Sequence, residues 1–209
     1  QDELVPSDLP EQMRIYVTES PWWDPDPQFI GDTVVDSGDR KAAEFAGVVV
    51  HQYSEFIRQL HLIYTGQQAR GFTFGKELGK LIENKQNFID ESLAAIEKIP
   101  VKNLDLSVMS GFLRTIQTTN RDVVKELFGK LLHSDTLVKY LLPLTTSVAM
   151  DKEDLERILY GLKAGKLEAV QFNSLTYGSS LSHLPTDTVA EFIRNFRSYS
   201  EESLPIAFV

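Results

Sequence analysis

From Ser37 onward, apolar residues recur at intervals of three and four, and this periodicity constrains the fold more than any other feature of the sequence. Such spacing places apolar side chains along one face of an α-helix, whereas a half-buried strand needs alternation at every second residue. The pattern continues to the C-terminal part of the chain. It therefore predicts an all-α fold.

Two long helices are predicted in the first half of the chain. The first begins at an Asp36 or Ser37 cap and ends at Gly66, and the second begins at a Thr73 cap and ends before Pro100. Their apolar stripes are Phe45, Val49, Tyr53, Phe56, Leu60 and Ile63, and then Leu78, Leu81, Ile82, Ile89, Leu93 and Ile96. Each helix would run about 25 residues, or about 38 Å, so the two are expected to form a long antiparallel hairpin.

Beyond Pro100 the predicted helices are shorter, and three of them share a register. Counted from candidate caps at Asn120, Asp151 and Thr186, the positions four and seven residues later are apolar in each. These positions hold Val124, Leu155 and Ala190, and then Leu127, Ile158 and Ile193. Second helices would carry Leu137, Leu141, Leu142 and Leu144 in one unit and Leu167, Val170 and Leu175 in the next. The pattern predicts helix–turn–helix units at intervals of 31 and 35 residues.

The region from Asn103 to about Phe196 resembles the HEAT-like helical repeat proteins in its spacing and its paired helices. The stretch 161–167, GLKAGKL, followed by Leu184-Pro185-Thr186-Asp187, is similar to the helix, glycine stop and proline-led restart of that class. The resemblance implies stacked helix pairs that bind other proteins, often within a longer chain, and it implies no catalytic residues. The interval is shorter than the roughly 40 residues of a HEAT unit, so an irregular helical bundle is the alternative.

Residues 1–36 differ in composition from the rest of the chain. They hold nine acidic residues and one basic residue, whereas residues 37–209 hold 21 acidic and 20 basic residues. Five of the nine prolines also lie here and exclude a long helix. We expect an irregular, acidic, Pro-rich arm, in which only Met13–Thr18 has the β-branched and aromatic composition of a short strand.

The candidate binding residues of this arm are Trp22, Trp23, Asp24 and Asp26. Two adjacent large aromatic side chains either fill a groove on the helical body or present a contact surface. The carboxylates are either solvated or form a docking strip for a basic partner. The near-neutral body offers no basic footprint, so nucleic acid is not an expected partner.

Motifs that carry chemistry are not found. The chain has no cysteine, which excludes disulfides, cysteine-bound zinc and thiol nucleophiles. Gly71–Glu77 fails as a phosphate loop because it is one residue short and has Glu77 where Ser or Thr is required, so its glycines are expected to form the hairpin turn. Ser180 and His183 lack the context of a catalytic triad, and Glu153 and Asp154 fit the first turn of a helix. We predict no catalytic, cofactor-binding or metal-binding residues.

These observations predict three segments: the acidic arm at 1–36, the helical hairpin at 37–100 and the HEAT-like segment at 101–209, with one continuous domain as an alternative. No apolar run approaches the roughly 20 residues that a membrane helix needs, so a cytoplasmic protein is expected. Because the chain begins with Gln1, we expect a processed chain or a fragment. The predicted function is a non-catalytic protein-interaction or scaffold module, a helical-repeat segment of a larger protein. The alternative is a small acidic inhibitor or immunity-type protein that neutralises a basic partner.

Overall fold

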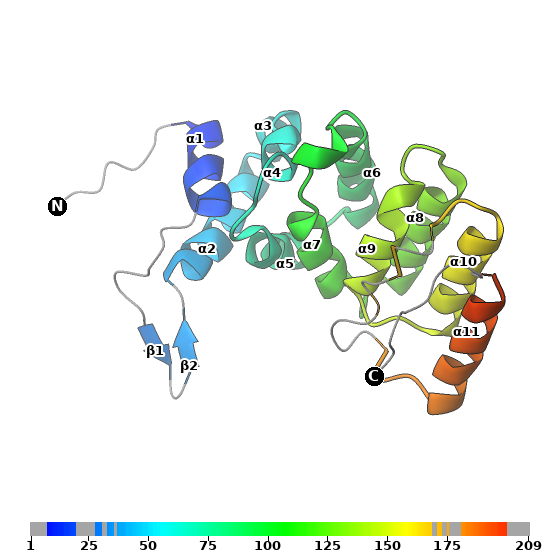
Figure 1. The fold of residues 1–209 in the computed structure, drawn as a ribbon. Helices are drawn as coiled ribbons and strands as arrows, with labels where there is room; N and C mark the ends of the chain where they lie inside the picture. The colour runs from blue at the N-terminus through cyan, green and yellow to red at the C-terminus, as the bar shows by residue number, and fades with distance from the viewer. Residues whose placement is uncertain are drawn as a thin grey trace. The chain divides into compact units, whose positions relative to one another are not determined.

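The computed structural model describes residues 8–19, 28–30, 33–35, 37–168, 171–172, 175 and 181–199. Within them the fold is all-α, as the periodicity predicts, with one small β-hairpin in the N-terminal part (Figure 1). The chain divides into two compact units, Gln1–Thr119 and Asn120–Val209. No helix in this described part is both long and apolar enough to cross a membrane.

The first predicted long helix is broken twice. It forms α2 (Ser37–His51), α3 (Tyr53–Arg58) and α4 (Leu60–Tyr64). The breaks lie at Gln52 and Gln59, where no glycine or proline requires them. Gly66 follows the last turn, as predicted, with a positive φ of 75° that L side chains rarely adopt.

The second predicted helix is also divided, because the chain turns between Leu81 and Lys85. Its parts are α5 (Gly71–Leu81) and α6 (Lys85–Ile96), followed by the 3-10 turn η2 (Val101–Asn103) and α7 (Ser107–Ile116). Thr73 lies inside α5 and caps nothing, whereas Asn84 caps α6 by accepting a hydrogen bond from the Asn87 N–H at 3.0 Å. α2 packs against α5, and α4 packs against α6. A hairpin would instead pair α4 with α5, so the long antiparallel hairpin is corrected to a set of shorter packed helices.

α5 packs most extensively against α7, which lies beside it in Figure 1. The buried small residues of α5 are Gly71, Gly75 and Gly79. A Cβ atom at Gly75 would overlap the carbonyl oxygen of Val108, and one at Gly111 on α7 would overlap that of Phe72. Glycine is required because the two helix backbones approach this closely. The prediction that Gly71 and Gly75 form a turn is therefore wrong.

The first described stretch, residues 8–19, is helical. α1 (Leu9–Met13) continues into the π-helix η1 (Arg14–Thr18). Leu9, Met13 and Val17 are buried. Their four-residue spacing forms one apolar face on a helix, so the expected strand at Met13–Thr18 is wrong. The hairpin of β1 (Gln28–Ile30) and β2 (Thr33–Val35) is antiparallel.

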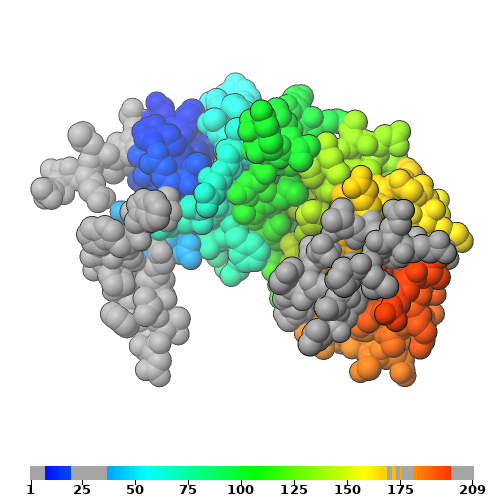
Figure 2. Space-filling model, in the orientation of Figure 1, coloured from blue at the N-terminus to red at the C-terminus, as the bar shows by residue number. Residues whose placement is uncertain are grey.

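This segment belongs to the core of the first unit. α1 packs against α4, and η1 packs against α2, α4 and α5. Figure 2 shows the blue surface of α1 and η1 directly against the cyan surface of the segment that includes α4. The Tyr16 ring lies 5.3 Å from the ring of Phe45, which stacks at 5.8 Å on Phe74. The irregular arm expected over residues 1–36 is thus partly a packed helix.

The second unit consists of short helices connected by turns. They are α8 (Arg121–His133), the 3-10 turn η3 (Val138–Tyr140), α9 (Leu141–Thr146), α10 (Lys152–Lys163) and α11 (Thr186–Tyr199). Asn120 and Asp151 precede α8 and α10 as predicted, whereas Thr186 is the first residue of α11 and not its cap. The predicted glycine stop of α10 is Gly165, with a φ of 67°.

The apolar positions predicted four and seven residues after each cap are buried in α8 and α10 but not in α11. The buried register positions are Val124 and Leu127 in α8 and Leu155 and Ile158 in α10. In α11, Ala190 and Ile193 are only half-buried, whereas Phe192 and Phe196 are buried. Phe196 packs 4.6 Å from the ring of Phe172. The buried face of α11 therefore centres on Phe192 and Phe196 and not on the predicted positions.

Candidate protein-binding groove

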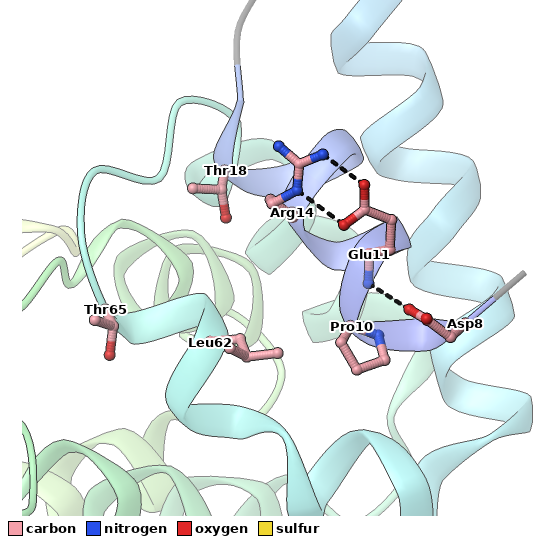
Figure 3. A pocket seen from close by; sticks show the side chains of 7 residues that line it. All are labelled: Asp8, Pro10, Glu11, Arg14, Thr18, Leu62 and Thr65. Carbon is pink, nitrogen blue, oxygen red and sulfur yellow. Dashed lines mark hydrogen bonds and ion pairs between the residues drawn. The ribbon is translucent and has the colours of Figure 1, made fainter. Parts of the chain in front are cut away.

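A groove of about 490 Å³ lies between the N-terminal helical segment and α4 (Figure 3). α1 and η1, with the residue that caps α1, contribute Asp8, Pro10, Glu11, Arg14 and Thr18, and α4 with its C-cap contributes Leu62 and Thr65. Segments about 50 residues apart in sequence therefore form its two sides. We call this feature the α1–α4 groove.

Local sequence explains the helix that forms the first side. Asp8 caps α1 by accepting a hydrogen bond from the Glu11 N–H at 2.8 Å. Pro10 lies in the first turn, where its missing N–H interrupts no helical hydrogen bond. The apolar face turns toward the core, so the polar residues of the same turns remain available to line the groove.

Arg14 is held between two carboxylates. Its Nε and Nη2 donate to the two Glu11 carboxylate oxygens at 2.9 and 2.5 Å, and its Nη1 forms an ion pair with Glu19. The hydrogen bond from Arg14 lowers the pKa of Glu11, and the same bond raises the pKa of Arg14. Both groups are therefore charged at neutral pH. The Glu11 and Arg14 side chains are still 43% and 49% exposed, so solvent and a partner can reach them.

Gln68 organises the loop behind the groove. Its Nε2 donates to the backbone oxygens of Thr65 at 2.8 Å and of Leu62 and Gly66 at 3.2 Å. Its Oε1 accepts a hydrogen bond from the Thr18 hydroxyl at 3.0 Å. Because Gln68 is only 4% exposed, one buried amide connects both sides of the groove.

Backbone hydrogen bonds reinforce this connection at the end of η1. The Arg70 N–H donates to the Val17 oxygen at 2.9 Å, and the Ala69 N–H donates to the Thr18 oxygen at 3.3 Å. Arg70 Nη1 also donates to the Glu19 oxygen at 3.0 Å. Carbonyls at the end of a helix have no partner within the helix, and here the α4–α5 loop supplies one. The two sides of the groove therefore hold a fixed separation.

The residues predicted as a binding site, Trp22, Trp23, Asp24 and Asp26, lie outside the described residues. From the sequence, the groove residues Asp8, Glu11 and Arg14 contribute to the charge of the predicted arm, and Arg14 also falls in the strand expected at Met13–Thr18. Leu62, Thr65 and Gln68 were not predicted, since no local pattern connects them to the N-terminal segment. The helical spacing of Leu9, Met13 and Val17 is the available signal, because it places Glu11 opposite the apolar face and Arg14 to one side of it.

A charged network in the second unit has a structural role. Asp154 is fully buried, and it forms a reciprocal capping box with Asp151 at the start of α10, with both hydrogen bonds at 3.0 Å. Arg157 donates to Asp154 at 2.7 Å, and Arg121 forms an ion pair with it. These contacts confirm that Glu153 and Asp154 lie in the first turn of a helix.

The pKa of Asp151 depends on the same network. Burial raises it, but the hydrogen bond from the Asp154 N–H and the charges of Arg121 and Lys125 outweigh burial, so the pKa is lower than its ordinary value. The hydrogen bond from Lys125 lowers the pKa of Glu153. Each carboxylate of the network therefore has a partner, and the network needs no ligand to explain it.

Other candidate groups are dispersed. His183 donates from Nε2 to the Met150 oxygen at 2.5 Å, and Ser180 lies outside the described residues. Among the described residues, no three His, Asp or Glu side chains gather closely enough to hold a metal ion. Comparison of the chain with protein-family models, curated proteins and solved structures finds no match. The geometry of the α1–α4 groove therefore carries the functional argument.

Proposed function

We propose that this chain is a non-catalytic protein-interaction module that binds a segment of a partner protein in the α1–α4 groove. The observation that carries the proposal is an open groove of about 490 Å³ with two sides connected by the buried Gln68. Connected sides matter because a preformed site avoids the entropy of ordering a loop when the partner binds.

The lining favours a macromolecule over a small ligand. Pockets for small molecules enclose most of the ligand. Here the groove is open, its rim residues Glu11 and Arg14 are about half exposed, and Pro10 and Leu62 supply apolar surface between its two sides. A polar, accessible rim around a small apolar patch is typical of protein interfaces.

The second unit would extend this role as a HEAT-like helical-repeat segment of a larger protein. The register shared by α8 and α10 supports the idea, because equivalent positions are buried in both helices. Stacked helix pairs bury one another's apolar faces and leave an extended surface for partners. The register of α11 is shifted, so α8 and α10 carry this support.

Peptide display tests the groove and requires no identified partner. A random peptide library is selected on the full chain, and the enriched peptides are then measured against two variants. Thr65→Tyr fills the groove from an exposed position, whereas Val101→Tyr adds the same group at a site that is 56% exposed and does not line the groove. Enriched peptides should bind wild type and Val101→Tyr equally and lose affinity for Thr65→Tyr. Equal binding to both variants, or no enrichment, would contradict the proposal.

The second candidate is a small acidic inhibitor or immunity-type protein, favoured by the nine acidic residues and one basic residue of residues 1–36. Such a charge would accelerate encounter with a basic enzyme. This candidate requires that partner binding abolishes the partner's activity. An interaction module would leave that activity intact, so an activity assay of an identified partner separates the two.

A further inference from the structure

We propose that the α1–α4 groove recognises an extended partner segment through a lysine or arginine side chain. This inference rests on the proposed function and specifies the chemistry of the partner. The argument begins with charge. Among the described residues, the groove lining holds one exposed cation, Arg14, and the two carboxylates of Asp8 and Glu11. A third carboxylate, that of Glu19, pairs with Arg14 beside the groove.

The carboxylates have acceptor capacity that Arg14 does not use. An ionised carboxylate offers about four acceptor positions. Glu11 accepts two hydrogen bonds from Arg14 at its two oxygens, and Asp8 accepts one from the Glu11 N–H. A group that carries several donors and no acceptor matches this surplus, and the ammonium of lysine and the guanidinium of arginine are such groups.

The remaining lining suits the rest of such a side chain. Pro10 and Leu62 face the groove, and they can contact the aliphatic stem of a lysine or arginine. At the other end, the Thr18 hydroxyl donates its hydrogen to Gln68, so its lone pairs remain to accept a hydrogen bond from the partner's backbone N–H. Acceptors therefore predominate along the groove.

An anionic partner fits less well. It would have to displace Glu11 from its bidentate contact with Arg14. The next cation along the loop, Arg70, is only 6% exposed and does not line the groove. Acidic segments are thus disfavoured by the same residues that attract basic ones.

Two synthetic decapeptide pools test the inference. The pools have equal apolar content, and one carries three lysine or arginine residues where the other carries three glutamates. Fluorescence anisotropy measures their binding to the full chain. We expect the basic pool to bind more tightly, with an affinity that falls as salt rises, because exposed charges are screened.

Charge-removing variants localise the effect. Asp8→Asn keeps the helix cap, since asparagine caps as well as aspartate, and Glu11→Gln keeps the shape of the side chain. The double variant should lose about five- to tenfold in affinity for the basic pool, the scale expected for two exposed charge contacts. The matched control is Glu126→Gln with Glu156→Gln, two exposed carboxylates that also form ion pairs within their own helices.

The outcomes separate the inference from the proposed function. A loss confined to Asp8→Asn with Glu11→Gln supports the inference. Equal losses in the control variant, tighter binding of the acidic pool, or no binding of the basic pool would overturn it. The proposed function survives those results if display-selected peptides of other composition still depend on Thr65, and it falls if no peptide does.

Discussion

The close contact between α5 and α7 gives the sharpest test of the fold. Substitution Gly75→Ala adds a methyl group that overlaps the backbone carbonyl of Val108. A backbone atom cannot rotate away as a side chain can, so the two helices must separate. Overpacking of this kind costs about 3 kcal/mol. Alanine has a helix propensity about 1 kcal/mol better than glycine, which leaves a net loss of about 2 kcal/mol.

Gly47→Ala is the matched control within the first unit. Gly47 lies in α2, and an added Cβ atom would meet nothing within 4 Å. Only the helix propensity then changes, so this variant should gain up to about 1 kcal/mol. The pair of variants applies the same chemical change to two helical glycines and predicts opposite signs.

Thermal unfolding followed by circular dichroism measures both variants. In a chain of this size, 1 kcal/mol shifts the midpoint by about 2–4 °C. Gly75→Ala should therefore melt about 4–8 °C below wild type, and Gly47→Ala should melt up to about 4 °C above it. If the melting temperature of Gly75→Ala equalled that of wild type, or rose as much as that of Gly47→Ala, α5 and α7 could not approach as closely as described.

Two further substitutions test the groove support and the α10 network. Gln68→Ala removes the buried amide behind the groove and should cost about 1–3 kcal/mol, with faster hydrogen exchange at the Ala69 and Arg70 amides. Asp151→Asn keeps the α10 cap but removes a carboxylate with a lowered pKa. A carboxylate with a lowered pKa stabilises the fold above its unfolded pKa, and this stabilisation is lost as the pH falls through its folded pKa. In urea titrations below about pH 4, the free energy of unfolding should therefore fall less in Asp151→Asn than in wild type. An unchanged exchange pattern, or an unchanged pH dependence, would contradict these assignments.

The parts of the fold that the sequence predicts well are those set by neighbouring residues. Gly66 and Gly165 have the positive φ expected of helix stops, and Asp151 caps α10. Each of these features needs only a few consecutive residues. The predicted register of α8 and α10 is equally local, because burial follows the helical period.

The features that were missed depend on distant contacts. Gln52 and Gln59 interrupt the first predicted helix without any local helix breaker, and the interruptions accompany packing of α2 on α5 and of α4 on α6. The glycine at Gly75 is not predictable from its neighbours in sequence, because the backbone of α7 that requires it lies more than 30 residues away. Gln68 has no sequence signature at all, since its role requires two backbone segments and a threonine to meet it.

The N-terminal segment shows why binding and stability must be tested by different changes. Its apolar face, Leu9, Met13 and Val17, is buried in the first unit, while Asp8, Glu11 and Arg14 line the groove on other faces. Deleting residues 1–36 would remove both sets. Burial of each large apolar side chain is worth about 1.5–3 kcal/mol, so the deletion should cost at least about 4 kcal/mol, a large part of the 5–15 kcal/mol typical of a native protein.

The deletion should therefore lower the urea midpoint of the first unit strongly, whether or not the segment binds a partner. A loss of partner affinity in that variant would not identify a docking role. If the deleted chain instead unfolded at the same urea concentration as wild type, the packing of Met13 and Val17 against the first unit would be refuted. The double substitution of Asp8 and Glu11 leaves the apolar face in place, so it tests recognition separately from folding, which the deletion cannot do.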